Sequence, residues 1–247
     1  MNEYNEITVP KINKTFLCRK TDEIRTGKSF YMKELYEQNL GSNYSDFVVC
    51  NEMQDYIKTL TLNKDDVWAD MGANIGAFGV LLHDKVKQIY GFEPHPDNCE
   101  VIKDQINFAK IGNYKLIEAA VINDDSIDHL ELYVHKKEMS HNLIRKLKGQ
   151  NEKSIKVPVM SFQEVLKLYP DINKIKMDIE GSEYDIILNH HDWTNIDELW
   201  FEWHGSLVKD ADKSKYHSII SHLKNHFTKV RAPKGPWNGL AMVHCTR

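Results

Sequence analysis

The chain has 247 residues, 41% of them hydrophobic and 10% aromatic, which suffices for the core of one α/β domain with an extension. Its formal net charge of −4 offers no global attraction to nucleic acid or to an anionic membrane. No apolar run approaches the roughly 20 residues of a membrane span, and the N-terminus does not resemble a secretory signal. The four cysteines are scattered without a paired motif, which indicates reduced thiols, and we expect a cytoplasmic protein.

The first 50 residues lack a strong hydrophobic period, and we expect them to form an extension that caps a domain of residues 51–247. Within this extension, residues 15–19 form a predicted strand and residues 30–38 a short predicted helix. A longer helix is predicted to begin at Asn51, whose side chain can act as an N-cap.

From residue 66 onward, predicted strands alternate with predicted helices. The strands cover residues 66–71, 88–92, 114–122, 174–180 and 198–204, and the helices cover residues 75–82, 97–108, 182 onward and 211–227. An insertion with strands at 129–135 and 156–160 leads to a helix that starts with the capping box Ser161 to Glu164. The last two strands, 228–231 and 240–245, flank a Pro/Gly turn and predict a hairpin. This order predicts an α/β fold with a doubly wound, mostly parallel sheet and an antiparallel edge.

The turn after the first of these strands indicates the kind of ligand. A dinucleotide-binding loop reads G-x-G-x-x-G, so that a pyrophosphate can rest on bare backbone. In this chain Gly72 is followed by Ala73, Asn74 and then Gly76, so a polar side chain replaces the second glycine. Asp70, at the strand end, would repel a pyrophosphate. A carboxylate and an amide suit a ligand with an ammonium and a carboxylate, such as the methionine part of S-adenosylmethionine, so the loop favours a methyl donor over NAD.

Glu93 ends the next strand, 17 positions after Gly76, which is close to the roughly 20 expected for an acid that binds ribose hydroxyls. The alternative is an acidic helix N-cap, but Pro94 and Asp97 already serve that helix start. We therefore predict that Glu93 contacts the donor ribose.

Charged residues also alternate in the strand at 174–180. Period-2 alternation places Lys176, Asp178 and Glu180 on one face, where charges are costly unless they reach a polar cleft or a solvated surface. In the strand at 198–204, Glu202 and His204 likewise share a face. These two predict substrate contact, or metal ligation together with Asp178, whereas a surface histidine satisfied by backbone is the alternative. The basic stretch at 136–156 predicts a solvated excursion or an acceptor-binding lid.

Three motifs together resemble the FkbM-type methyltransferase family. They are Asp70-Met-Gly-Ala-Asn-Ile-Gly76, Phe92-Glu-Pro94 and Lys176-Met-Asp-Ile-Glu-Gly-Ser-Glu183, and the resemblance covers roughly residues 51–204. It implies the class I methyltransferase layout, S-adenosylmethionine as the cofactor, and O-methylation of a hydroxyl, in many members on a sugar of a glycan or glycoside. It also implies that Asp178 and Glu180 line the reaction centre, and it matches Asn107 to a recurrent family asparagine. Metal dependence is not settled by the resemblance.

The candidate residues follow from these arguments. For the donor they are Asp70, Gly72, Ala73, Asn74, Gly76, Glu93, Pro94, Asn107 and Ala120, the last at the end of the third strand. For catalysis they are Asp178 or Glu180 as the base, His204 as the second candidate base, and Lys176 as a charge that holds the carboxylate ionised or positions the acceptor. A divalent metal, if one binds, would take Asp178, Glu202 and His204.

Two rival functions remain open on the sequence. The first is an NAD-dependent sugar oxidoreductase, which would not need the closing hairpin, and Asn74 and Asp70 argue against it. A non-catalytic nucleotide-binding module would keep the fold and lose the chemistry, and the intact charged face around Asp178 argues against that. The expected partner is a sugar or glycan acceptor, without nucleic acid.

Overall fold

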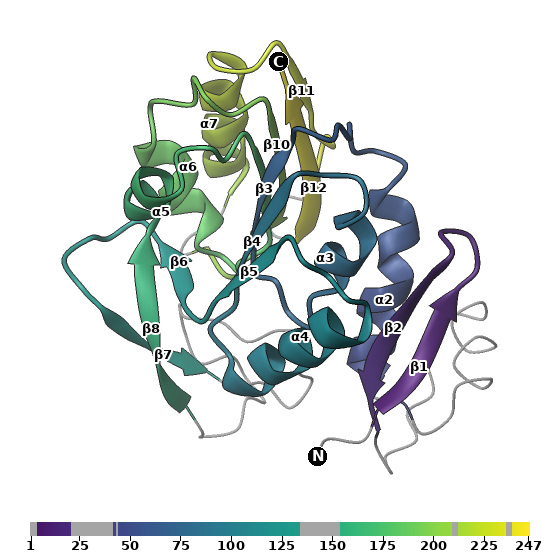
Figure 1. The fold of residues 1–247 in the computed structure, drawn as a ribbon. Helices are drawn as coiled ribbons and strands as arrows, with labels where there is room; N and C mark the ends of the chain where they lie inside the picture. The colour runs from purple at the N-terminus through teal and green to yellow at the C-terminus, as the bar shows by residue number, and fades with distance from the viewer. Residues whose placement is uncertain (1–3, 21–41, 43, 134–153, 209–211, 236–238) are drawn as a thin grey trace.

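A seven-stranded sheet in the order β11-β12-β10-β9-β3-β4-β5 forms the centre of the molecule (Figure 1). The computed structural model describes residues 4–20, 42, 44–133, 154–208, 212–235 and 239–247. The strands are β3 (Val67–Met71), β4 (Gln88–Phe92), β5 (Tyr114–Ile117), β9 (Lys174–Met177), β10 (Glu198–His204), β11 (Lys229–Arg231) and β12 (Leu240–Thr246). The first five run parallel, and β12 runs antiparallel to both β10 and β11. The predicted doubly wound sheet with a C-terminal hairpin is confirmed.

The order of the strands locates the place where a ligand can bind. The chain enters the sheet at β3, moves outward through β4 and β5, and then returns to add β9 and β10 on the other side of β3. In open α/β sheets, ligands bind outside the carboxyl ends of the strands where the direction of winding reverses. That place is the carboxyl end of β3 and β9, between Met71 and Met177.

Helices cover both faces of the sheet (Figure 1). One face packs against α5 (Phe162–Leu168), α6 (Glu183–Asn189) and α7 (Lys213–Lys224), and the other against α2 (Tyr44–Tyr56), α3 (Ala77–Leu82) and α4 (Pro96–Phe108). Ile175 and Leu199 belong to the first core, and Trp68 and Ile89 to the second. Because side chains alternate along a strand, the neighbours of the first set point to the second layer. Lys176, Glu202 and His204 therefore share the face covered by α2, α3 and α4, which we call the α2 face.

The N-terminal hairpin of β1 (Tyr4–Val9) and β2 (Lys14–Arg19) packs outside this helical layer and contributes to its core. The side chain of Arg19 binds the carboxylate of Asp46 in α2, at 2.6 and 2.9 Å. The boundary drawn at residue 50 falls inside α2, and the predicted helix start at Asn51 is wrong. The buried stripe begins earlier, at Phe47, and the side-chain amide of Asn51 donates to the carbonyl of Phe47 within the helix.

Other element boundaries also differ from the predictions. The predicted strand 114–122 is two strands, because β5 ends at Ile117 and β6 (Ala120–Ile122) joins a separate sheet with β8 (Ser154–Ser161) and β7 (His129–Tyr133). Helix α4 begins at Pro96 after His95, one residue earlier than predicted. The capping box is confirmed, since the hydroxyl of Ser161 accepts the backbone N–H of Glu164 at 3.1 Å.

Several predictions concern residues beyond the described parts. The predicted helix at 30–38 and most of the basic stretch, residues 136–153, lie outside the described residues. The four cysteines are all buried and free, as expected. Among the described helices, none combines the length and the apolar composition that crossing a membrane requires.

Candidate active site

The loop after β3 is held tightly against the ends of two neighbouring strands. The backbone N–H groups of Gly72 and Ala73 both donate to the carbonyl of Phe92 at 3.0 Å, at the end of β4. A Cβ atom on Gly72 would lie 1.8 Å from the carbonyl oxygen of Asp178, so only glycine fits against the end of β9. Three loop residues have left-handed backbone: Gly72, Asn74 and Gly76. Glycine adopts this conformation without strain and asparagine tolerates it, which explains the residue choice at these positions.

Glu93 lies directly beside this loop. Its carboxylate accepts the backbone N–H of Asn74 at 2.8 Å, the backbone N–H of His95 at 2.9 Å and the side-chain amide of Asn98 at 3.3 Å. Burial raises the pKa of Glu93 to about 7, although these donors oppose the rise. The buried amide oxygen of Asn98 has no hydrogen-bond partner among the described residues. A buried acid with an unused acceptor next to it fits a ligand that carries hydroxyl groups, such as the ribose of S-adenosylmethionine.

Asp70 and Lys176 form a buried ion pair beneath the loop. The ammonium of Lys176 lies 3.2 Å from Asp70 Oδ1 and 3.7 Å from Asp178 Oδ2, and it donates to the carbonyl of Gly72 at 2.8 Å. Burial favours neutral Lys176, but the charges of Asp70 and Asp178 outweigh it and raise the lysine pKa. Burial also raises the pKa of Asp70, and Lys176 opposes that rise. Lys176 is therefore a charged residue that connects the donor loop to Asp178.

His204, at the end of β10, is surrounded by carboxylates. Its Nδ1 lies 3.1 Å from Glu183 Oε1, while its Nε2 lies 3.5 Å from Glu180 Oε2, 3.7 Å from Asp178 Oδ1 and 3.9 Å from Glu202 Oε2. We call these five residues the acid–histidine cluster. Sequence alternation predicted the shared location of Asp178 and Glu180, but for a wrong reason. Strand β9 ends at Met177, and Glu180 reaches the cluster through a turn in which its own φ is +54°.

Glu183 holds this arrangement in place. Its carboxylate is buried and accepts the backbone N–H groups of Ile179 and Gly181, both at 2.8 Å, in addition to its contact with His204. It thus fixes both the turn after β9 and the orientation of the imidazole ring. The sequence motif that ends at Glu183 did not indicate this role.

The charges of the cluster shift its titration strongly. Burial would lower the pKa of His204, but the carboxylates of Glu183, Asp178 and Glu180 outweigh it and raise the pKa to about 10. Burial and the charge of Asp178 raise the pKa of Glu202 to about 7. Burial raises the pKa of Glu180 to about 8, with His204 opposing and Asp178 adding to the rise. At neutral pH the cluster therefore contains a protonated imidazole and a largely neutral Glu180.

A divalent metal fits this cluster only in part. Asp178, Glu183 and His204 offer ligand atoms within 4.8 Å of one another, so Glu183 takes the place that the sequence suggested for Glu202. Two carboxylates and an imidazole suit Mn²⁺ or Zn²⁺. However, Glu183 already accepts two backbone N–H groups and faces His204 Nδ1, and a metal would compete with these contacts.

Not every predicted residue reaches the site. Asn107 is exposed near the far end of α4, about 17 Å along the helix from Pro96, so the structure does not bring it to the loop. Pro94 directly follows Glu93, and Ala120 begins β6 just beyond the end of β5.

One aromatic residue joins the site without having been predicted. The ring of Tyr56, in α2, stacks on Trp200 of β10 with centroids 4.3 Å apart. Burial and the charges of Asp178 and Glu202 raise the pKa of its hydroxyl. The sequence did not indicate this residue, because only packing brings the last turn of α2 onto β10.

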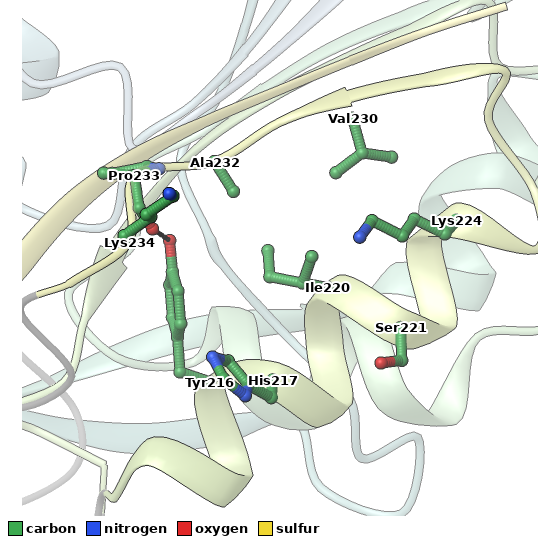
Figure 2. Close-up of a pocket in the computed structure, with 9 residues that line it drawn as sticks. All are labelled: Tyr216, His217, Ile220, Ser221, Lys224, Val230, Ala232, Pro233 and Lys234. Atoms are coloured by element: carbon green, nitrogen blue, oxygen red, sulfur yellow. Dashed lines mark hydrogen bonds between the residues drawn. The ribbon is translucent and has the colours of Figure 1, made fainter.

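A hollow on the opposite face of the sheet is separate from this site. It lies between α7 and β11, and in Figure 2 the hydroxyl of Tyr216 reaches the carbonyl of Pro233 across it, at 3.0 Å. Ile220 and Val230 form its apolar side and belong to the α5–α6–α7 layer. None of its lining residues belongs to the loop after β3 or to the acid–histidine cluster.

A doubly wound sheet with a closing antiparallel hairpin, and a glycine loop and a buried acid at its switch point, define a class I S-adenosylmethionine-dependent methyltransferase. The family described as "Methyltransferase FkbM domain" matches residues 70–226. The chain belongs to this FkbM family, as the sequence resemblance predicted.

Solved structures with a similar chain path include three methyltransferases. Methyltransferase FkbM from Methylobacillus flagellatus KT has a TM-score of 0.47 and 14% identity, over 89% of this chain and 56% of that one. M. jannaschii TYW2 in complex with AdoMet has a TM-score of 0.49 and 14% identity, over 99% and 86%. Precorrin-6y C5,15-methyltransferase from Geobacter metallireducens GS-15 has a TM-score of 0.44 and 13% identity, over 93% and 96%. None of the curated protein sequences matches the chain.

Proposed function

We propose that this methyltransferase transfers the methyl group of S-adenosylmethionine to a hydroxyl group of a sugar or glycan. The observation that carries the proposal is the position of Asp178. Its carbonyl oxygen lies against Gly72 of the donor loop, while its carboxylate faces Lys176 on one side and His204 on the other. One residue therefore links the loop that would hold the donor to the acid–histidine cluster.

The donor side of the proposal assigns Glu93 to the ribose hydroxyls and the loop around Asn74 to the methionine end. A diol that donates to Glu93 would favour its ionised form, which burial now disfavours. Asp70 is completely buried, so it would not contact the donor directly. It supports the loop through its ion pair with Lys176. When bound, S-adenosylmethionine supplies an electrophilic methyl group on a sulfonium.

The acceptor side of the proposal assigns the proton transfer to Asp178. A sugar hydroxyl is a weak nucleophile at neutral pH and needs a base as the new bond forms. The ammonium of Lys176 and the protonated imidazole of His204 both face the carboxylate of Asp178, and Glu183 keeps the imidazole directed at it. Glu180, largely neutral at pH 7, can donate a hydrogen bond to the acceptor. These groups orient the hydroxyl, and alignment supplies much of the rate in a methyl transfer.

The test measures methyl transfer from labelled S-adenosylmethionine to a panel of simple methyl glycosides, with an amine and a thiol of similar size as competing acceptors. We expect label on the glycosides and a methyl-sized mass increase in the product. Asp178→Asn should lose this transfer, and Asp185→Asn is its matched control, because this exposed acid lies in the first turn of α6 beside Glu183. Label found only on the amine or the thiol would overturn O-methylation, and label on none of the glycosides would overturn the sugar acceptor.

A further inference from the structure

Two exposed apolar side chains lie next to the acid–histidine cluster. Leu240 and Met242, on β12, are 57% and 39% exposed. In the pairing of β12 with β10, Leu240 lies directly opposite His204, and Met242 directly opposite Glu202. Residues opposite each other in an antiparallel pair share a face, with Cβ atoms roughly 5 Å apart. We call Leu240 and Met242 the apolar shelf.

The exposure of the shelf is not explained by packing. The other side of β12 carries Ala241 and Val243, which are buried in the core under α6 and α7. On the shelf side, β12 continues with polar residues, His244 and Thr246. The remaining large exposed apolar side chains of the described residues occur singly on other elements: Phe108, Ile127 and Leu168. Two neighbouring apolar side chains beside a charged cluster are therefore a candidate contact surface for a ligand.

Beyond Glu202, the same face of β10 is covered by α2 and buried. Trp200 precedes Glu202 by two residues on β10 and so lies on the same face, where the ring of Tyr56 covers it. An acceptor whose hydroxyl points at Asp178 would contact the carboxylates of the cluster. The aliphatic side chains of the shelf would lie on the neighbouring strand, one interstrand distance from that hydroxyl. That spacing of roughly 5 Å lies within the width of a single sugar ring and its substituents.

We propose that the apolar shelf binds an apolar substituent on the acceptor sugar, so that the acceptor is a deoxyhexose whose methyl group packs on Leu240 and Met242. This inference rests on the proposed sugar O-methylation. In a hexose, a hydroxyl group would take the place of that methyl hydrogen and would be buried against two side chains without a strong hydrogen-bonding group. The shelf thereby selects against the hydroxylated sugar as well as in favour of the deoxy one.

The test uses two pairs of glycosides that differ only in the hydroxyl at C6. They are methyl α-L-rhamnopyranoside against methyl α-L-mannopyranoside, and methyl β-D-fucopyranoside against methyl β-D-galactopyranoside. In the pair that the enzyme uses more efficiently, we expect kcat/KM to be about tenfold higher for the deoxy member. This value is at the low end for a methyl-sized contact, because the shelf is open on one side. The double variant Leu240→Asn with Met242→Gln should reduce this preference to less than about threefold.

Leu168→Asn is the matched control, because Leu168 is 55% exposed at the end of α5 and lies on the other face of the sheet. It should keep the wild-type preference, and all variants should bind S-adenosylhomocysteine with wild-type affinity in calorimetry. Equal use of both members by the wild-type enzyme, or a preference that the double variant leaves unchanged, would overturn the shelf and leave sugar O-methylation standing. Absence of transfer to all four glycosides would overturn both. A dimer in sedimentation experiments that the double variant dissociates would assign the shelf to a second copy instead.

Discussion

Strand β10 carries two glutamates on the α2 face, and their environments shift their pKa values in opposite directions. Glu198, at the amino end, accepts from His244 at 2.7 Å and from Lys174 at 3.0 Å. Burial alone would raise the pKa of Glu198, but these two donors lower it. Glu202 lies at the carboxyl end of the same strand, where burial and the charge of Asp178 raise its pKa to about 7.

The difference separates a structural cluster from a reactive one. At the amino end, Lys174 lies 3.0 Å from both Asp66 and Glu198, and it also donates to the carbonyl of Thr61. At the carboxyl end, carboxylates outnumber the two cations Lys176 and His204: Asp70, Asp178, Glu180, Glu183 and Glu202. At the amino end the hydrogen-bond donors lower the pKa of Glu198, whereas at the carboxyl end the excess of carboxylates raises the energy of the unliganded protein. The excess lies where a doubly wound sheet binds its ligands.

Asp178→Asn tests the reactive end and should have the largest effect. We expect kcat to fall by roughly 10²–10⁴-fold, the usual contribution of a general base, because the amide keeps the shape and loses the proton acceptor. Binding of S-adenosylhomocysteine should remain near wild type in calorimetry, since the backbone of residue 178 is what contacts Gly72.

Glu180→Gln is the matched comparison for that variant. A carboxyl group whose pKa is about 8 is mostly neutral at pH 7, and glutamine can replace its hydrogen-bond donor. We expect a much smaller decrease in kcat. Equal losses in both variants would show that the two acids act together, and full activity in Asp178→Asn would remove Asp178 from the chemistry.

Lys174→Met tests the structural end. Removing the lysine leaves Asp66 and Glu198 buried without their cation, which typically destabilises a protein by about 3–5 kcal/mol. Denaturant unfolding measures the decrease in unfolding free energy. At low temperature, where Lys174→Met remains folded, its kcat should equal that of the wild type. Lys58→Met is a suitable control, because this exposed lysine pairs only with its helical neighbour Asp55 among the contacts of the described residues. A variant with normal stability and reduced kcat would reverse the roles that we assign to the two ends.

The sequence predicted most of the fold, because the pattern of the sheet is local. The strands at 88–92 and 198–204 have the predicted bounds, and the terminal hairpin pairs as expected. The sequence did not show that the predicted strand at 114–122 is two strands, because the break after Ile117 depends on which sheet each half joins. The start of α2 was misplaced because its buried stripe begins at Phe47, inside a segment without a clear period.

The sequence located the candidate site more successfully than it explained it. Strand ends alone brought together Asp178, Glu180 and His204. Glu183 was missed, because its importance comes from contacts with His204 and with the backbone of the preceding turn. Tyr56 was missed because only packing brings α2 onto β10. Residue type and spacing do not encode the long-range contacts of Glu183 with His204 and of Tyr56 with Trp200.

Glu93→Ala tests whether the donor binds at the end of β4, away from both charged ends of β10. We expect a loss of at least ~1.5–3 kcal/mol in donor binding, the range of charge-assisted hydrogen bonds, because the variant removes the acceptor for the ribose hydroxyls. Calorimetry with S-adenosylhomocysteine measures it. Glu100→Ala is the control, since this exposed glutamate lies about one turn into α4 and pairs with Lys103. Unchanged donor affinity in Glu93→Ala would place the ribose elsewhere.

The smallest expected effect is a change in how stability depends on pH. The pKa of Glu180 is raised from 4.5 to about 8, so between these values the folded protein keeps a proton that the unfolded chain has released. A state that binds more protons loses stability as pH rises, and Glu180 therefore destabilises the donor-free protein progressively from pH 4.5 to about 8. His204, raised from 6.5 to about 10, acts in the same direction at higher pH, because its contribution is complete below 6.5 and is lost toward 10.

Thermal unfolding of the donor-free protein between about pH 6 and 9 checks this sign. The Tm should fall as pH rises. In Glu180→Gln, the total decrease in Tm between about pH 6 and 9 should be smaller by a few degrees. A change of 1 kcal/mol in unfolding free energy shifts Tm by about 2–4 °C in a chain of this size. Glu198→Gln is the comparison from the other end of β10. The lowered pKa of Glu198 means that its stabilising contribution is lost only as pH falls below about 4.5, so this variant should lower Tm at every pH in the interval without changing the slope. A slope that Glu180→Gln leaves unaltered would show that the charge imbalance at the carboxyl end is relieved by something other than proton uptake.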